Sequence, residues 1–270
     1  MAKVLVVTSG KGGVGKTTST AAIGAALAQN GKKVAVVDFD VGLRNLDLVM
    51  GAERRVVFDL INVVQGIAKL PQALIRDKRL ENLWLLPASQ TRDKEALTEE
   101  GVGRVIAEMR NNFDWILCDS PAGIERGAML AMRHADEAVI VTNPEVSSVR
   151  DSDRIIGMLD SKTVKAEKGE TVAKHILITR YDPARAARGE MIGIEDILEI
   201  LATPLLGIIP ESQDVLRASN VGSPVTLNSP ASAPARAYAD ATRRLLGETL
   251  PMLVPAEPKG LMKLFGRRAA

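Results

Sequence analysis

Short apolar runs recur along the chain and are separated by longer segments of mixed polarity. Each run is four or five residues long, too short to cross a membrane, which takes about 20 apolar residues. Continuous apolar runs of this length indicate strands buried on both faces, as in a parallel sheet covered by helices on each side. The runs that predict strands are residues 4–7, 33–37, 83–86, 115–118, 138–142, 175–179 and 205–209.

The segments between these runs have helical periodicity. Residues 17–29 are rich in alanine and glycine, which lets a helix lie close to a sheet, and Gly31 ends the pattern. Apolar residues recur at helical spacing from Val102 to Met109, after a capping threonine at position 98. The other predicted helices are residues 59–65, 71–75, 147–159, 194–201, 214–219 and 231–247.

The alternation of strand and helix, repeated about seven times, predicts the fold class α/β: a doubly wound, mostly parallel sheet flanked by helices. Right-handed crossovers bring the carboxyl ends of all strands to one edge of such a sheet, where ligands bind. The polar residues that follow the predicted strands should therefore converge. They are the glycine-rich loop at 10–18, Asp38, Asp40, Asp119, Arg180 and Pro210.

The loop after the first strand reads Gly-Lys-Gly-Gly-Val-Gly-Lys-Thr-Thr and contains the phosphate-binding pattern G-x-x-x-x-G-K-[ST]. Its glycines let backbone N–H groups converge on a phosphate, and the following helix contributes its N-terminal N–H groups. Lys16 is expected to reach the β- and γ-phosphates of ATP, and the hydroxyl of Thr17 to ligate Mg²⁺. The alternative is a chance glycine-rich turn. The candidate nucleotide-binding residues here are Lys11, Gly12, Gly13, Val14, Gly15, Lys16, Thr17 and Thr18.

Carboxylates follow two of the predicted strands. The second strand ends in Asp38-Phe39-Asp40, and residues 115–118 lead into Asp119 and a Ser-Pro-Ala-Gly turn. An acid after four apolar residues is the Walker B arrangement, in which the carboxylate meets Mg²⁺ directly or through water. We therefore predict metal and water contacts at Asp38, Asp40 and Asp119. The alternatives are solvated loop acids and an ordinary turn after a strand.

Lys11 places a second lysine in the phosphate loop. Two cations this close repel each other unless more negative charge is present, and the loop holds no acidic residue. The variant resembles the deviant Walker A motif of the MinD/ParA ATPases, in which this lysine reaches the nucleotide of a partner subunit. By that resemblance, Lys11 implies a homodimer formed on ATP binding. The alternative is a solvated loop lysine.

Composition narrows the possible functions. The net charge of +2 gives no broad basic field, so we expect no nucleic-acid partner. Cys118 is the only cysteine, too few for a disulfide or a metal cluster, which suggests a reducing cytosol. The chain opens directly on a strand pattern, so no signal peptide is expected. We interpret His134 and His175 as structural or surface residues, since neither has partners at metal-ligand spacing.

The C-terminus divides into two further segments after a P-loop ATPase domain at 1–248. Residues 249–258 hold three prolines and indicate a flexible linker. Residues 259–270 indicate an amphipathic membrane-targeting segment, because Leu261, Leu264 and Phe265 would share one side of a helix and three cations another. The cations are Lys259, Lys263 and Arg267.

The sequence predicts that residues 259–268 bind an anionic membrane surface. Each cation contributes about 1 kcal/mol near an anionic leaflet, and a single short anchor binds only marginally. Two anchors on a dimer gain from an effective concentration near the millimolar range. ATP-dependent dimerisation would then control attachment. The alternatives are a disordered basic tail and a helix docked on the body of the protein.

Long blocks of the chain resemble the septum-placing members of the MinD/ParA family, over nearly its whole length. The blocks are residues 11–18, 38–47, 119–123 and 143–154, with the amphipathic tail. The resemblance implies slow ATP hydrolysis, with Asp40 orienting or activating the attacking water and with Asp38 and Asp119 in the magnesium shell. It also implies an adenine pocket at Arg180, Pro210 and Glu211, a contact from Glu145 to the partner's ribose, and Asn45 at the dimer centre.

The resemblance also implies partners and a location. The helix around residues 150–153 resembles the surface where the division inhibitor MinC and the activator MinE compete, and MinE would stimulate hydrolysis and release the dimer. The protein would be cytoplasmic and would cycle to the cytoplasmic face of the inner membrane. Two rivals are a ParA-like partition ATPase that uses DNA as its surface and a metal-cluster carrier. The cations of the tail argue against the first and the single cysteine against the second.

Overall fold

Eight strands form one sheet in the order β3-β4-β2-β5-β1-β6-β7-β8. The computed structural model describes residues 2–90 and 94–255, and its strands are parallel except for the β3–β4 pair. This confirms the predicted doubly wound, mostly parallel α/β fold. The strands are β1 (Lys3–Thr8), β2 (Val34–Asp38), β3 (Ile75–Arg76), β4 (Leu83–Leu86), β5 (Trp115–Asp119), β6 (Glu137–Thr142), β7 (Ala173–Tyr181) and β8 (Leu205–Pro210).

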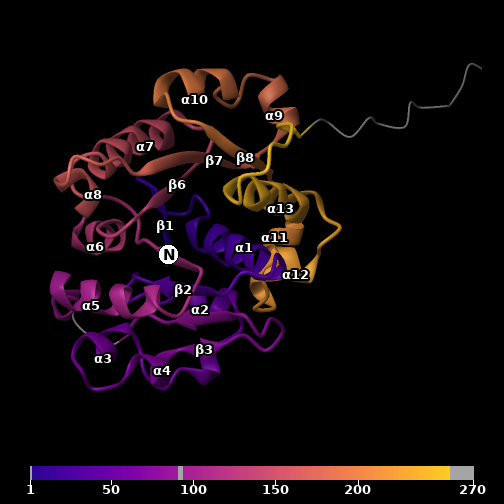
Figure 1. Ribbon diagram of the computed structural model, residues 1–270. Coiled ribbons are helices and arrows are strands. Elements are labelled where there is room, and N and C mark those ends of the chain that lie inside the picture. Colours follow the sequence, from indigo (N-terminus) through magenta and orange to yellow (C-terminus); the bar gives the residue numbers. More distant parts are fainter. Residues whose placement is uncertain (1, 91–93, 256–270) are drawn as a thin grey trace, which may run out of the picture.

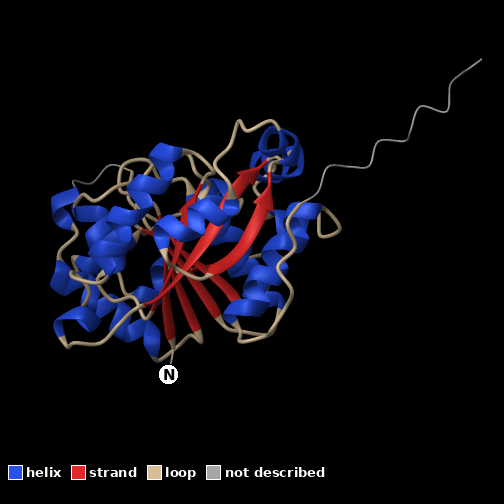
Figure 2. Cartoon of the chain, turned by 90° about the horizontal axis from the view of Figure 1, so that it is seen from above, coloured by secondary structure: helices blue, strands red, loops and turns tan. Residues whose placement is uncertain are grey.

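Helices cover both faces of the sheet (Figures 1 and 2). The helices α1 (Lys16–Gln29), α11 (Gln213–Asn220), α12 (Val225–Asn228) and α13 (Ala233–Leu245) pack on one face. The other face is covered by α3 (Leu60–Val64), α4 (Leu70–Ala73), α5 (Glu99–Arg110), α6 (Arg126–Met132), α7 (Val146–Leu159) and α10 (Ile194–Leu201). The remaining short helices are α2 (Leu46–Val49), α8 (Val164–Glu167) and α9 (Pro183–Ala187), with 3₁₀ turns at Glu53–Arg55 and Lys94–Ala96.

Alternate strand residues enter two separate apolar cores, one on each face of the sheet. In β1, Val4 and Val6 belong to one core and Leu5 and Val7 to the other, and all four side chains are fully buried. This is why the strand sequences are apolar without alternation. In the described part of the chain, no helix is long and apolar enough to span a bilayer.

Two parts of the predicted element order differ from the structure. The helix predicted at 71–75 is wrong at its end, because Ile75 begins the antiparallel edge strand β3, which pairs with β4. The helices α6, α8, α9 and α12 are not predicted by the sequence at all. Each has at most two turns, too short for its periodicity to stand out, so packing decides its structure.

Helix α1 lies close against the sheet at Gly24. A Cβ atom at this position would lie 2.8 Å from Cγ1 of Val36 in β2, closer than carbon atoms pack. The glycine therefore sets the separation of α1 from the sheet, and α1 begins directly at the end of the glycine-rich loop.

We expect Gly24→Val to destabilise the protein by about 2 kcal/mol, because overpacking forces the helix away from the sheet. Gly157→Ala is a matched control in α7, since an added Cβ there meets no atom within 4 Å. The control should be neutral or stabilising by up to about 1 kcal/mol, from helix propensity. Urea unfolding measures both variants. Equal stabilities for the two would contradict the close contact at Gly24.

Candidate nucleotide-binding site

The glycine-rich loop between β1 and α1 has the backbone form that the sequence predicts. Gly13 and Gly15 adopt positive φ angles of 76° and 98°, which side chains disfavour. A Cβ at Gly10 would collide with the Cβ and main chain of Asp151 in α7. The loop is therefore folded tightly against α7, with α1 starting at Lys16.

Lys16 is held inside this loop. Its Nζ donates hydrogen bonds to Oγ of Ser9 at 2.8 Å and to the carbonyl of Lys11 at 3.4 Å, and the residue is only 8% exposed. Burial lowers the pKa of Lys16, while the carboxylates of Asp119 and Asp40 act in the opposite direction. Sequence reasoning missed Ser9, because it lies just before the phosphate-binding pattern.

Asp38 and Asp119 lie side by side at the carboxyl ends of β2 and β5, as partners in the parallel register. Both are buried. Asp38 accepts hydrogen bonds from the backbone N–H groups of Asp40 at 2.8 Å and Leu46 at 3.2 Å, and Asp119 accepts one from Oγ1 of Thr20 at 3.1 Å. Thr20 is a further residue that the sequence analysis did not single out.

Burial raises the pKa of Asp38 well above its ordinary value, with a further contribution from the charge of Asp119. Burial also raises the pKa of Asp119 to about 7, whereas hydrogen bonds from Thr17 and Thr20 and the charge of Lys16 act to lower it. Two adjacent buried carboxylates beside a threonine hydroxyl are an oxygen donor set of the kind Mg²⁺ takes together with phosphate oxygens. The chemistry of these side chains therefore fits the predicted Mg²⁺ site.

A cavity of about 690 Å³ opens in front of the loop. Among the residues predicted to bind nucleotide or act in catalysis, this cavity gathers Gly12, Gly13, Gly15, Lys16, Thr17, Thr18, Asp40, Asn45 and Arg180. Ser120, Pro121 and Ala122, from the turn after β5, also line it. Of the strand-end residues predicted to converge, Asp40 and Arg180 therefore line this cavity together with the loop, whereas Asp38, Asp119 and Pro210 do not.

A second cavity of about 580 Å³ adjoins the first and shares Gly15, Thr18, Arg180 and Ser219 with it. Its walls include the other residues predicted for an adenine pocket, Pro210 and Glu211, and also Val14. Its walls also include residues that the sequence did not point to, among them Ser212, Gln213, Val215, Leu216, Ser219 and Tyr238. The two cavities have the size and the arrangement for a phosphate chain and a base on either side of Arg180.

Arg180 has an unusual backbone conformation at the junction of the two cavities. Its φ angle is +53°, in the left-handed region, and the pairing of β7 with β8 shifts register between Ile178 and Tyr181. Such strained positions concentrate at ligand sites.

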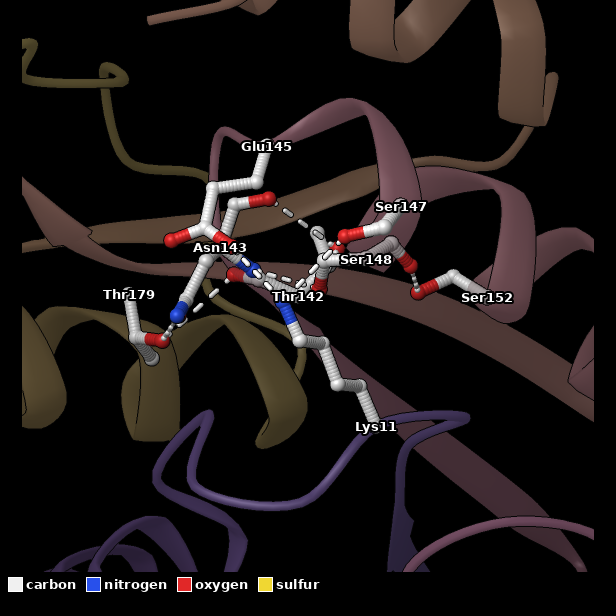
Figure 3. Close-up of polar contacts among 8 residues, drawn as sticks. All are labelled: Lys11, Thr142, Asn143, Glu145, Ser147, Ser148, Ser152 and Thr179. Carbon is white, nitrogen blue, oxygen red and sulfur yellow. Dashed lines mark hydrogen bonds and ion pairs between the residues drawn. The ribbon is translucent and has the colours of Figure 1, made fainter.

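Lys11 and Glu145 do not line either cavity. Nζ of Lys11 pairs with Oε2 of Glu145 at 2.8 Å and donates to Oγ of Ser147 at 3.2 Å (Figure 3). Both side chains are about half exposed, at 41% and 51%. In the single chain, Lys11 is therefore bound at the start of α7.

A buried polar network joins the same helix to the loop (Figure 3). Oγ1 of Thr179 lies 2.6 Å from the carbonyl of Val14 and 2.9 Å from Oδ1 of Asn143. The backbone N–H of Asn143 donates to Oγ of Ser148 in the first turn of α7, at 3.1 Å. Sequence reasoning did not predict these contacts, because Thr179 is a single polar residue at the end of an apolar strand and its partners come from distant parts of the chain.

Cys118 is buried in β5, and His134 and His175 are partly buried. Burial raises the pKa of the Cys118 thiol to about 12, so it stays protonated and unreactive. Burial lowers the pKa of both His134 and His175. The described residues contain no group of three or more His, Cys, Asp and Glu side chains that could hold a metal by themselves.

Comparison with known proteins agrees with this geometry. The CobQ/CobB/MinD/ParA nucleotide binding domain (CbiA) matches residues 5–225. The septum site-determining protein MinD of Escherichia coli K12 is 62% identical over 270 residues, covering 98% of this chain and all of the relative. The chain belongs to the MinD family. The predicted resemblance to the MinD/ParA ATPases is thereby confirmed.

Solved structures of the MinD family have the same fold. MinD in an Aquifex aeolicus MinC:MinD cell division protein complex is 44% identical, with a TM-score of 0.84 over 95% of this chain and all of that one. MinD of Pyrococcus horikoshii, complexed with Mg-ADP, is 33% identical, with a TM-score of 0.79 over 91% of this chain and 96% of that one.

We expect Asp119→Asn to stabilise the ligand-free protein above pH 7. The folded-state pKa of Asp119 is raised from 3.8 to about 7, so the folded state binds more protons than the unfolded chain between these values, and the native protein loses stability as pH rises through them. Asparagine removes that loss, so the variant should be more stable than the native protein at high pH. The difference in stability should vanish as the pH falls toward 4. Calorimetry between pH 4 and 8 measures the two melting temperatures.

Asp153→Asn is the matched control, since Asp153 is an exposed carboxylate on α7. It should leave melting temperatures nearly unchanged at every pH. An Asp119→Asn variant less stable than the native protein at pH 8 would show that the carboxylate is favourably placed without a cation.

Proposed function

We propose that this protein is an ATPase that pairs on binding ATP, attaches to the membrane as a dimer and takes part in placing the division septum. The observation that carries the proposal is the two-lysine phosphate loop, folded in front of a cavity that holds Lys16, Thr17 and Asp40. Membership in the MinD family supports it. The P. horikoshii relative bound to Mg-ADP supports ATP and Mg²⁺ as the ligands.

Lys16, the glycine-loop N–H groups and the start of α1 would bind the β- and γ-phosphates. Lys16 is already buried and directed by Ser9, so it needs little reorganisation to do this. Thr17, Asp38 and Asp119 would hold Mg²⁺, which supplies Lewis-acid neutralisation of the phosphate charge when bound. The two buried carboxylates and the ammonium group of Lys16 would place charges of both signs around the terminal phosphate.

Asp40 would orient or activate the water that attacks the terminal phosphorus. It lines the larger cavity two residues beyond the end of β2, and its own N–H is fixed by Asp38 at 2.8 Å. Water adds to phosphorus as the bond to the β-phosphate oxygen breaks, releasing ADP and phosphate. Asp40 would hold the attacking water in line with the leaving group.

Lys11 would act on the nucleotide of the partner subunit. To do so it must leave Glu145 and Ser147, its partners in the single chain. An exposed ion pair of this kind is worth no more than about 1 kcal/mol, so the lysine can be drawn away by a triphosphate. Glu145, once released, would contact the partner's ribose, and Asn45 would lie at the dimer centre.

Arg180, Pro210 and Glu211 would form the adenine pocket. They line the second cavity, with Tyr238 fully buried behind them and joined to Ser19 at 3.0 Å. A base in this pocket and phosphates on the loop would place the nucleotide across Arg180.

Partner proteins would bind to α7, and the C-terminal segment would bind to the membrane. Arg150, Asp153 and Arg154 are exposed on α7, and the A. aeolicus MinC:MinD complex supports MinC as a partner. MinE would compete there and stimulate hydrolysis. The membrane segment at 259–268 and the end of the linker lie outside the described residues, so the division into an ATPase domain at 1–248, a linker at 249–258 and a tail at 259–270 is part of the proposal.

Co-sedimentation with anionic vesicles in ATP, ADP or no nucleotide tests the function. We expect ATP alone to give strong binding, and Phe265→Glu to abolish binding while leaving ATP affinity intact, because a buried charge opposes insertion of the apolar side. Val57→Glu, at an apolar side chain that is 78% exposed on the body of the protein, controls for an added charge. Retention of the ATP-bound protein on DNA but not on vesicles would favour a ParA-like partition ATPase.

Asp40→Ala should trap the ATP-bound dimer, because binding survives and the attacking water is no longer positioned. Turnover is expected to fall at least tenfold, with dimer persisting on light scattering long after the native protein has returned to monomer. Asp153→Ala, which removes an exposed carboxylate from α7, is the control. Native turnover in Asp40→Ala would remove this residue from the mechanism.

A further inference from the structure

Arg244, near the end of α13, binds three main-chain carbonyl groups from two separate parts of the chain. Its Nη1 donates to Leu206 in β8 at 2.9 Å, its Nη2 to Pro251 at 2.7 Å, and its Nε lies 3.4 Å from the carbonyl of Leu250. The guanidinium thus joins residues 250–251 to β8, the edge strand of the sheet. Hydrogen bonds from a charged donor are the stronger kind.

The residues that follow also contact the body of the protein. Met252 packs against the apolar core, and residues 252–255 form one wall of a groove of about 450 Å³. The opposite wall includes Gly207 and Ile208 of β8 and Ala237 of α13. Leu253 itself is 66% exposed. The chain from 250 to 255 therefore follows β8 and α13 without forming a helix or strand of its own.

This arrangement bears on how far the C-terminal segment can reach. The effective concentration of a tethered segment falls as the tether before it lengthens. The contacts of Leu250, Pro251 and Met252 with the body shorten the tether that precedes the proposed membrane segment at 259–268. For two paired subunits, fixed starting points raise the chance that both segments meet one surface.

We propose that Arg244 is a positioning residue that fixes the place where the C-terminal segment leaves the body, so that a dimer presents both segments to one anionic surface. The inference rests on the proposed membrane function. It goes beyond that function by assigning the strength of attachment to a residue that itself touches neither nucleotide nor lipid.

A spin label at position 253 tests whether Arg244 holds residues 250–251 on the body of the protein. Leu253→Cys gives an exposed thiol, while the single native cysteine, Cys118, is buried with its pKa raised to about 12 and resists labelling. We expect Arg244→Ala to sharpen the label's spectrum to that of a mobile chain. Arg244→Lys should give an intermediate spectrum, because lysine keeps the charge and loses the fork of donors. An unchanged spectrum in Arg244→Ala would overturn the proposal.

Arg243→Ala is the matched control. It removes the same charge from the neighbouring position, where the ion pairs of Arg243 within the described residues are with Glu248 at 2.6 Å and Asp240 at 3.8 Å. Its label spectrum and vesicle binding should match those of the native protein. An equal loss of vesicle binding in both variants would mean that the lost positive charge weakens binding. That result would overturn the positioning role of Arg244.

Vesicle binding then tests the consequence. With ATP and phosphatidylglycerol-containing vesicles, Arg244→Ala should bind several-fold more weakly than the native protein, with unchanged ATP-dependent dimerisation and ATP hydrolysis in solution. Native binding in Arg244→Ala would refute the role in attachment. If the native protein itself fails to bind vesicles, the proposed membrane function fails, and the label spectra still decide whether Arg244 holds the segment.

Discussion

The organising constraint of this protein is the meeting of two buried carboxylates and one buried ammonium group at the ends of neighbouring strands. Asp38 and Asp119 are register partners in β2 and β5, and Lys16 starts the helix that follows the adjacent β1. Burial disfavours the charged form of each of them, raising the pKa values of the acids and lowering that of the lysine. Such a group of charges is costly in an empty site and is suited to receive a phosphate chain with a cation.

The surrounding fold serves to hold these groups in place. The parallel sheet brings the strand ends together, Gly24 lets α1 lie close to β2, and the glycines of the loop allow the backbone to turn in front of Lys16. The arrangement also connects the loop to α7. Gly10 packs directly on Asp151, and Thr179 with Asn143 links Val14 to the first turn of that helix. Helix α7, which also carries exposed charged side chains, is therefore in direct contact with the phosphate loop.

Sequence alone predicted the fold and the main positions of the site, because both depend on local signals. Apolar runs that end in Asp38, Asp119 and Pro210 mark strand ends, and the phosphate-binding loop has a fixed spacing. The predictions for Lys16, Thr17 and Asp40 converged because parallel topology forces strand ends together. Ser9, Thr20 and Tyr238 could not be predicted in this way. Their roles come from tertiary contacts, and a lone serine, threonine or tyrosine in an apolar segment carries no spacing signal. The same holds for Arg244, one of two adjacent arginines that differ only in what the fold places beside them.

The central claim is that the charges at the strand ends become balanced only when a phosphate chain binds together with a divalent cation. Thermal unfolding at pH 8 tests this claim most directly. The native protein should be melted with ATP and Mg²⁺, with ATP and a chelator, and with Mg²⁺ alone. The account predicts that the rise in melting temperature with both ligands exceeds the sum of the two separate rises. Equal stabilisation by ATP with and without Mg²⁺ would contradict it.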